Sequence, residues 1–407
     1  MQAGAAQYRN HRITSSLGMA HFGFFLLFPG FFVYQTLIGM GAMSAYLGGY
    51  FAVVSIALVV PLGLTYCTVP SDGKSQLTLG DLGFGLFLTY FLAIVLLNAV
   101  FGANGTIIRT HLLSILYFFN IYLIFKNIDL SGSKAKFLSQ TSLVLMSSLI
   151  LFYARDGSFN LGYLGDPKSP ESVATYQGFA RSYVVTFVVV LACTSSILAR
   201  VALYGVAVVA LFLIGSRSEL VAVVLLIPVV ELYRARNGLH MITVVLLVVS
   251  ILWNGPKFML EIFPDSRVWE LFDLSHSQSA NARHDLTQRA LRTIAEHPVL
   301  GDYGSYPPGE YAHNILSAWV DLGFFGFVYM LTMLLRTAII LLTQGRSKRQ
   351  SSDEALLAWS LVFIALFLLF TAKNFDDMFT GAAMGAFACY CRRNNRRVIT
   401  TGESHYR

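Results

Sequence analysis

The sequence predicts an all-α polytopic membrane protein with about twelve transmembrane helices. Hydrophobic residues make up 55% of the 407 residues and charged residues only 13%, whereas a soluble domain carries about 25% charged residues. The mean hydropathy is +0.61. Apolar stretches of the roughly 17 to 25 residues needed to cross a bilayer recur along the whole length. We therefore expect a single transmembrane domain over residues 1–407, with membrane lipids around it.

The individual spans follow from the length and apolarity of each stretch. They are expected near residues 17–38, 44–66, 82–100, 107–125, 138–154, 182–198, 201–215, 218–233, 239–254, 314–343, 355–371 and 376–391. The first is too long for a typical signal-peptide core, so we interpret it as an anchor. The four cysteines lie in or at the ends of spans, which argues against a disulfide framework; they are Cys67, Cys193, Cys389 and Cys391.

The lysines and arginines orient these spans with both chain termini in the cytoplasm. Of the 29 basic residues, 17 then fall on the inner side, mostly in short connections, 11 fall on the outer side, and Arg336 lies within a span. Five of the outer eleven belong to one long loop, where positive charge has little influence on orientation. The net charge of +7 is therefore mostly a topology signal and does not indicate a nucleic-acid partner.

Two outer segments are long enough to carry a function. One is the loop at 155–181, which contains the turn-forming sequence Asp-Pro-Lys-Ser-Pro. The other is a large loop at about 255–312. Within it, residues 281–296 have helical periodicity, with Asn281 as the expected N-cap.

The short helix in the large loop has two contrasting faces. Its apolar stripe consists of Leu286, Ala290 and Ile294, and its other face is expected to carry the i,i+4 pairs Asp285–Arg289 and Arg292–Glu296. Arg283 falls in the middle of the apolar stripe. Because a buried guanidinium needs an anion, Arg283 either reaches past the helix end to water, pairs with a carboxylate such as Asp321, or binds an anionic ligand.

Glycine and proline breakers lead from this helix to Tyr311-Ala312-His313-Asn314. His313 and Asn314 open the segment 313–343, so they are expected at the membrane surface, with Asn314 and Asp321 on one helix face. His313 is either an interfacial capping residue or an acid–base group that the preceding loop delivers to a site.

Arg217 lies in a tight outer turn, Ser216-Arg217-Ser218-Glu219, between two spans. It either pairs locally with Glu219, reaches lipid headgroups, or serves a function, since ionisable residues at membrane depth are functional candidates by default. A pair of arginines could hold a phosphate or diphosphate through charge-assisted hydrogen bonds.

Three motifs in this order resemble the bacterial O-antigen ligase and O-antigen polymerase superfamily over about residues 200–345. Ser216-Arg217 is similar to the Ser-Arg turn of that family. The other two similarities are to its Arg…Ala-Leu…His-Pro-hydrophobic-Gly signature and its His-Asn…Leu…acid-x-Gly-x-x-Gly segment, and they consist of Arg283, Ala290-Leu291, His297-Pro298, Leu300-Gly301, His313-Asn314, Leu316, Asp321, Gly323 and Gly326. The family often has tryptophan where this chain has Thr287.

The resemblance implies a metal-independent glycosyltransferase of the GT-C type, without a cofactor, in the bacterial inner membrane with its active site facing the periplasm. Its donor would be an oligosaccharide linked to undecaprenyl diphosphate. His313 would act as the general base on the acceptor hydroxyl, and Arg217 and Arg283 would hold the diphosphate. Further substrate-binding residues are expected at Arg289, Tyr311, Asn314 and Asp321.

The leading hypothesis is the polymerase of lipopolysaccharide O-antigen biosynthesis, which extends one lipid-linked glycan with another. The loop at 155–181 favours it by offering a second outer segment for a growing glycan chain, and a chain-length regulator would be a further partner. The alternative is the ligase, which transfers the glycan to the lipid A-core acceptor with the same donor and the same residues.

Two other classes fit the sequence less well. A flippase for lipid-linked oligosaccharides would need polar groups along the membrane interior, and the spans are nearly free of charge. A metal-dependent glycosyltransferase would want carboxylates in the first outer loop, and residues 39–43 have none. Asp376 and Asp377, in the last outer loop, are expected in a solvated turn.

Overall fold

The computed structural model describes residues 18–43, 49–68, 78–155, 157–159, 176–235, 278–307, 310–347 and 352–402, with five isolated positions between 242 and 261. These residues form helices joined by turns, with one isolated bridge between Arg155 and Ser158. Eight of the described helices are long and apolar enough to cross a membrane. The chain is therefore a polytopic helical membrane protein, as its composition predicts.

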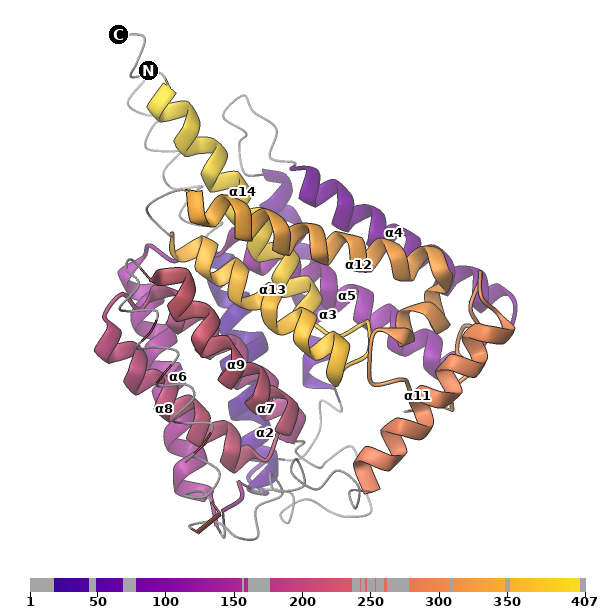
Figure 1. The fold of residues 1–407 in the computed structure, drawn as a ribbon, viewed down its shortest axis with the longest axis horizontal. Helices are drawn as coiled ribbons and strands as arrows, with labels where there is room; N and C mark the ends of the chain where they lie inside the picture. Colours follow the sequence, from indigo (N-terminus) through magenta and orange to yellow (C-terminus); the bar gives the residue numbers. More distant parts are fainter. Residues whose placement is uncertain are drawn as a thin grey trace.

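The helices surround one another in a bundle (Figure 1). In chain order they are η1 (Leu26–Gly30), α2 (Phe31–Gly39), α3 (Tyr50–Thr68), α4 (Leu79–Val100), α5 (Gly105–Asn127), α6 (Ser133–Tyr153), α7 (Tyr176–Cys193), α8 (Ile197–Ile214), α9 (Arg217–Arg234), α11 (Gln278–Glu296), α12 (Leu316–Ser347), α13 (Asp353–Thr371) and α14 (Phe379–Gly402). The π-turn η1 interrupts one helix over Gly18–Gly39. It contains Pro29, which has no backbone N–H to donate within the helix.

The predicted spans fall on these helices wherever the structure describes the chain, but only eight of the described helices are long and apolar enough to cross a membrane, so the number twelve stays a prediction. The span expected near 239–254 and the middle of the loop at 155–181 lie outside the described residues. Several boundaries are wrong. The span expected near 182–198 is helical only to Cys193, where α7 ends, and α8 begins at Ile197. The helix of the large loop begins at Gln278 rather than after a cap at Asn281, and α14 continues to Gly402 rather than ending at 391, its polar last turns projecting from the bundle (Figure 1).

The centre of the bundle is the packing of α14 against α5 and α13. Gly381 and Gly385 on α14 face the α5 backbone: a Cβ on Gly381 would lie 3.0 Å from the Phe118 carbonyl oxygen, and one on Gly385 would overlap the carbonyl oxygen of Tyr122. Small residues four apart let two helices approach at backbone distance, which is how helices associate where lipid removes the hydrophobic driving force between them.

Buried ion pairs lie at one end of the bundle, next to the ends of the predicted spans; of their four residues only Glu231 falls inside one. Lys126 Nζ lies 2.6 Å from Asp81 Oδ1, and both side chains are almost fully buried. Arg200 Nε lies 2.6 Å from Glu231 Oε1, also buried. Sequence windows miss such pairs because the partners are far apart along the chain, whereas a buried charge is tolerated only with its partner in place.

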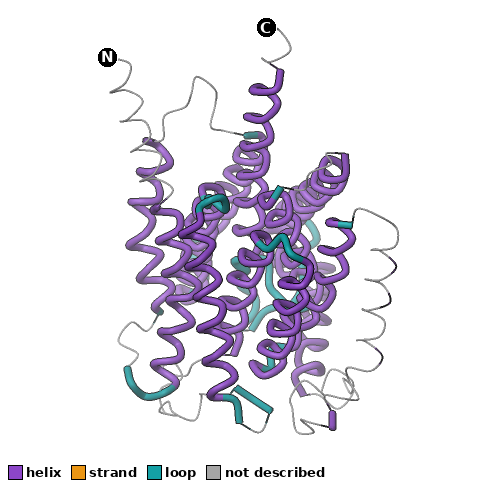
Figure 2. Tube along the Cα trace, turned by 90° about the vertical axis from the view of Figure 1, so that its left-hand side faces the viewer, coloured by secondary structure: helices purple, strands orange, loops and turns teal. Residues whose placement is uncertain are grey.

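Both described ends of the chain meet at this same end of the bundle. On the first helix, His21 Nε2 forms a 3.0 Å hydrogen bond with the Asp129 carbonyl oxygen, and Arg393 of α14 pairs with the Asp129 carboxylate at 2.8 Å. We call this the Asp129 end; Figure 2 shows the first helix and α14 reaching it together. The opposite end, where α12 begins, is called the His313 end.

At the His313 end, α12 is broken by Gly323, whose backbone is non-helical (φ 71°, ψ 178°). The segment 299–304 crosses α12 at this break. Asp302 N donates to the Val320 carbonyl oxygen at 2.8 Å, and Phe324 N donates to that of Val299 at 3.0 Å. This crossing attaches the end of α11 to the start of α12 and so fixes the loop that carries His313.

Candidate functional site at the His313 end

The loop between α11 and α12 places Tyr311 and His313 side by side. Their ring centroids are 4.4 Å apart with the planes tilted by 47°. Ala312 between them is fully buried, in a small apolar cluster with Ala290, Tyr306 and Val320. Leu286 and Ile294 pack against that cluster, so the predicted apolar stripe of α11 is confirmed. The stripe therefore positions the histidine by seating the loop on α12.

His313 is held in its neutral form at physiological pH. Burial of the imidazole lowers its pKa, the nearby Arg283 lowers it further, and the result is a pKa of about 4 in spite of a hydrogen bond to the Ala372 backbone. The nitrogen Nδ1 is buried and has no hydrogen-bond partner in the described part of the chain. In the neutral tautomer that carries its proton on Nε2, the lone pair on Nδ1 can accept a proton.

Arg283 is a half-buried arginine without a protein anion. It lies on α11, close enough to interact electrostatically with His313 and Tyr311. Its guanidinium forms no hydrogen bond or ion pair with the described residues, and Asp321, its alternative partner, instead accepts a 3.0 Å hydrogen bond from Gly304 N. A partly desolvated, unpaired guanidinium favours an anion from outside the protein.

Arg217 begins α9 at the same end of the bundle. Two residues later, Glu219 is fully buried, and Lys373 Nζ lies 2.7 Å from its Oε1. The local partner predicted for Arg217 is therefore bound by the lysine that follows α13. Lys373 in turn interacts electrostatically with His313. The structure brings Arg283 directly to His313 and connects the Arg217 turn to it through Glu219 and Lys373.

A second buried ion pair adjoins the first, and it overturns the expected solvated turn at Asp377. Arg181 Nη2 lies 2.8 Å from Asp377 Oδ2, whose side chain is only 6% exposed. Asp376 accepts a 2.6 Å hydrogen bond from Ser114 Oγ. The carboxylates of Asp376 and Asp377 are thus both bound by other side chains of the protein. Sequence reasoning missed Arg181, Lys373 and Asp377 as a group; the signal was a charge at each of three span boundaries.

Two cavities lie beside this cluster, with volumes of about 290 Å³ and 170 Å³. Tyr311, Asn374 and Asp376 belong to the walls of both. The larger also exposes Arg181 and Gln177, and the smaller is lined by polar groups that include His111 and Asp321. His313 and Arg283 are not wall residues of either cavity. Arg217 is not a wall residue of either cavity, and the two cavities reach the predicted site residues through Tyr311 and Asp321.

The remaining predicted site residues have structural contacts. Arg289 is exposed and pairs with Glu310 at 3.1 Å, rather than with Asp285 as expected. Asn314 Nδ2 donates to Thr287 Oγ1 at 3.1 Å, which ties α11 to the start of α12 at the position where the resembling family often has tryptophan. Asp321 is buried and anchors Gly304. Of these three, Asp321 also lines a cavity.

The fold and this site define a class: a polytopic helical membrane protein with a buried, charged, polar site at one end of its bundle. No family model, curated protein or solved structure matches the chain. The function of this protein is therefore inferred from the residues of the His313 end.

Proposed function

We propose that this chain is a membrane glycosyltransferase that transfers a glycan from undecaprenyl diphosphate to a sugar hydroxyl. The observation that carries the proposal is the neutral imidazole of His313 beside the unpaired guanidinium of Arg283. A neutral imidazole can take a proton, and a guanidinium can hold a phosphate oxygen. The two together suit a reaction in which a hydroxyl attacks and a phosphate leaves.

In the proposed reaction the acceptor hydroxyl oxygen forms a bond to the anomeric carbon of the donor glycan. The bond between that carbon and the diphosphate oxygen breaks, and its electron pair leaves with the lipid diphosphate. The acceptor proton passes to His313. Negative charge grows on the diphosphate as the bond breaks, so Arg283 stabilises the transition state more than the ground state.

Charge coupling makes this pair responsive to the donor. The positive charge of Arg283 helps to keep the His313 pKa low. A diphosphate bound at Arg283 offsets that charge and raises the pKa of His313, which makes the imidazole a better base when the donor is present. Arg217 adds a second cation in the proposal. Lys373 and Arg181 are already paired with carboxylates and contribute less charge.

The two cavities suit sugar recognition on either side of Tyr311. Their walls combine aromatic rings with hydroxyl, amide and carboxylate groups, which are the usual mixture for a ligand rich in hydroxyls. Because Tyr311 packs on His313, movement of its side chain would open the imidazole to both cavities. In the proposal one cavity receives the acceptor sugar and the other the sugar of the donor.

We further propose that the His313 end faces the periplasm of a bacterial inner membrane. The support is the positive charge at the opposite end, where short connections favour the cytoplasm. There the described basic residues include Lys126, Lys136, Arg200, Arg234, Arg392 and Arg393. The O-antigen polymerase is our specific form of the proposal. The three motifs resemble the superfamily as a whole, and the loop at 155–181, whose middle lies outside the described residues, is what favours the polymerase over the ligase.

The test is a reconstitution with purified protein in nanodiscs and lipid-diphosphate repeat units as the only substrate. We expect a ladder of longer lipid-linked glycans, lost in His313→Ala and reduced at least about a hundredfold in Arg283→Ala. Arg292→Ala is the matched control, because Arg292 lies on the same helix but is exposed, and it should leave the ladder unchanged.

The same assay separates the polymerase from the ligase. If the protein makes no ladder until lipid A-core is added, and then transfers single glycans to it, the ligase is correct and the polymerase is wrong. A normal ladder from His313→Ala would remove the proposed base in either case.

A further inference from the structure

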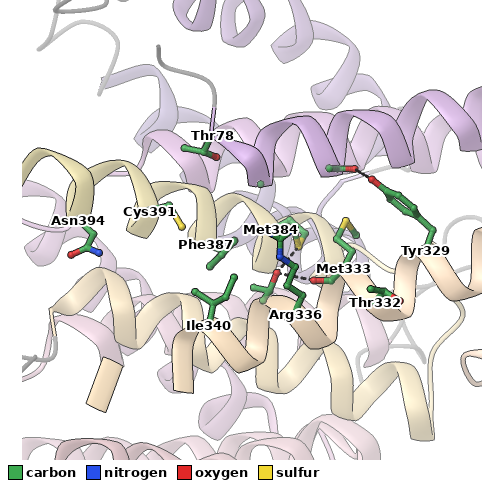
Figure 3. A pocket seen from close by; sticks show the side chains of 13 residues that line it. Thr78, Tyr329, Thr332, Met333, Arg336, Ile340, Met384, Phe387, Cys391 and Asn394 are labelled. Atoms are coloured by element: carbon green, nitrogen blue, oxygen red, sulfur yellow. Dashed lines mark hydrogen bonds between the residues drawn. The ribbon is translucent and has the colours of Figure 1, made fainter. Parts of the chain in front are cut away.

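A groove of about 520 Å³ runs between α4, α12 and α14 toward the Asp129 end, away from the His313 site. Figure 3 shows it with the side chains that line it. Its apolar walls come from Met333 and Ile340 of α12 and from Met384 and Phe387 of α14. Gly80 and Gly83 of α4 also belong to its wall, and their lack of side chains leaves the groove deep between the helices.

The groove opens onto a surface suited to lipid. Large apolar side chains beside it are exposed on both flanking helices, with Leu82 58% and Leu86 57% exposed on α4 and Leu335 41% and Ile339 59% on α12. Both helices belong to the apolar spans. Exposed leucine and isoleucine on a membrane-spanning helix face acyl chains, so the groove is open to the bilayer.

Arg336 is the one cation in the described wall of this groove. It is exposed, lies within the apolar span Leu316–Thr343, and points from α12 toward Met384 of α14 (Figure 3). It forms no hydrogen bond or ion pair with the described residues. The buried carboxylate of Asp81 near the groove is already bound by Lys126 at 2.6 Å. A charge placed this way within a span is costly unless an anion or water reaches it.

The position of Arg336 allows a lipid phosphate to reach it. It lies about 10 Å from the end of its span at 1.5 Å per residue, a distance that a long side chain reduces by snorkelling toward the headgroups. Thr332 lies one helical turn deeper in the span on the same face, so the phosphate is bound by Arg336 alone. The guanidinium can bind two phosphate oxygens at once.

We infer that this groove binds one anionic phospholipid of the surrounding bilayer. Its phosphate lies on Arg336, and one acyl chain lies along Met333, Met384 and Phe387. Methionine side chains adapt to an irregular chain, and the unpaired guanidinium selects a lipid with net negative charge. The donor of the proposed reaction is not the occupant, because Arg336 lies about 20 Å along α12 beyond the break at Gly323, on the side away from His313.

A lipid in this groove contacts three helices from distant parts of the sequence. Binding to the folded protein alone stabilises it by mass action. The expected consequence is a protein whose stability in detergent depends on added anionic phospholipid, whether or not the glycosyltransferase proposal is correct.

The experiment titrates full-length protein in mild detergent with phosphatidylglycerol or phosphatidylcholine and follows bound lipid by native mass spectrometry and the apparent Tm. We expect one tightly held phosphatidylglycerol and a rise in Tm that phosphatidylcholine does not give. Arg336→Gln should bind phosphatidylglycerol at least about tenfold more weakly, and Arg336→Lys should recover part of the binding. Arg292→Gln, at an exposed position of α11, is the control and should behave as the parent protein.

Met384→Trp provides a second route, because it fills the groove and leaves Arg336 in place. It should weaken phosphatidylglycerol binding even if Arg336→Gln fails to fold. Equal binding of the two lipids by the parent protein, or unchanged phosphatidylglycerol binding in Arg336→Gln or Met384→Trp, would overturn the inference.

Discussion

Where the segment after α11 crosses α12, Gly301 faces the backbone of the segment that contains Gly323, and Gly323 faces the backbone of the segment that contains Gly301. A Cβ on Gly301 would overlap the Val320 carbonyl oxygen, and one on Gly323 would lie 2.6 Å from that of Val299. Both glycines have positive φ, +70° and +71°. Each is therefore required twice, once by its conformation and once by its neighbour. The crossing gives a physical reason for glycine at both positions of the motifs that carry the family resemblance.

Gly323→Ala should destabilise the protein and disturb the loop that holds His313. Its φ of +71° with ψ of 178° lies in a region that costs a residue with a side chain about 1–3 kcal/mol, and the overlap with the segment 299–300 adds to this. The apparent Tm in detergent should fall by several degrees. Gly85→Ala, where an added Cβ meets nothing within 4 Å, is the control, and helix propensity predicts an unchanged or slightly higher Tm. Equal Tm values for the two variants would contradict the crossing.

Glu219→Gln should destabilise the protein through Lys373. The ammonium is 2.7 Å from Glu219 and both side chains are almost fully buried, so removing the carboxylate leaves a buried cation without its counter-charge. Breaking such a pair costs about 3–5 kcal/mol. The double variant with Lys373→Met should regain a large part of the lost stability, because it removes the unpaired charge. A double-mutant cycle on thermal unfolding measures the coupling, and additive effects would show that the two residues do not stabilise each other.

Arg283→Ala should raise the pKa of His313 from about 4 toward its usual value near 6.5. Burial is the largest cause of the low pKa and would remain, but the repulsion from the guanidinium, the next largest cause, would be gone. NMR of the protein with isotope-labelled histidine, assigned by comparison with His313→Gln, follows the titration directly and needs no substrate. The control is Arg292→Ala, in which the His313 titration should not move. An unchanged His313 titration in Arg283→Ala would show that the charge of Arg283 does not affect the pKa of His313.

Local patterns predicted the helices of this protein well. Spans such as 107–125 and 355–371 lie within α5 and α13 to within two residues, because apolar length is a property of neighbouring residues. The apolar stripe of α11 was predictable for the same reason. Its beginning was not: Asn281 is a good N-cap by type, but the helix extends back to Gln278.

Charge partners could not be predicted in the same way. Arg289 of α11 binds Glu310, which follows the end of that helix. Arg181 of α7 binds Asp377, which lies far from it along the sequence. Which carboxylate an arginine binds depends on which helix ends lie close together in space. Helical periodicity singled out Arg283, and the breakers before the last long span singled out His313. Both are local patterns, whereas the ion pairs around them join distant segments and could not be predicted.

Inorganic diphosphate should bind at the His313 end and raise the pKa of His313. In the free protein the positive charge of Arg283 favours the neutral imidazole of His313. A bound anion offsets that charge, so His313 in the complex keeps its proton to a higher pH than in the free protein. By reciprocity, diphosphate must bind more tightly to the protonated histidine. Its affinity should therefore rise as the pH falls through the raised pKa of the complex and level off below the free value of about 4.

Isothermal titration at several pH values, with the histidine NMR titration repeated at saturating diphosphate, measures both sides of this linkage. Arg283→Ala should lose most of the affinity and the pH dependence together, whereas Arg292→Ala should keep both. Diphosphate that binds with equal affinity at pH 5 and pH 8 would show that the anion and the imidazole do not share a site.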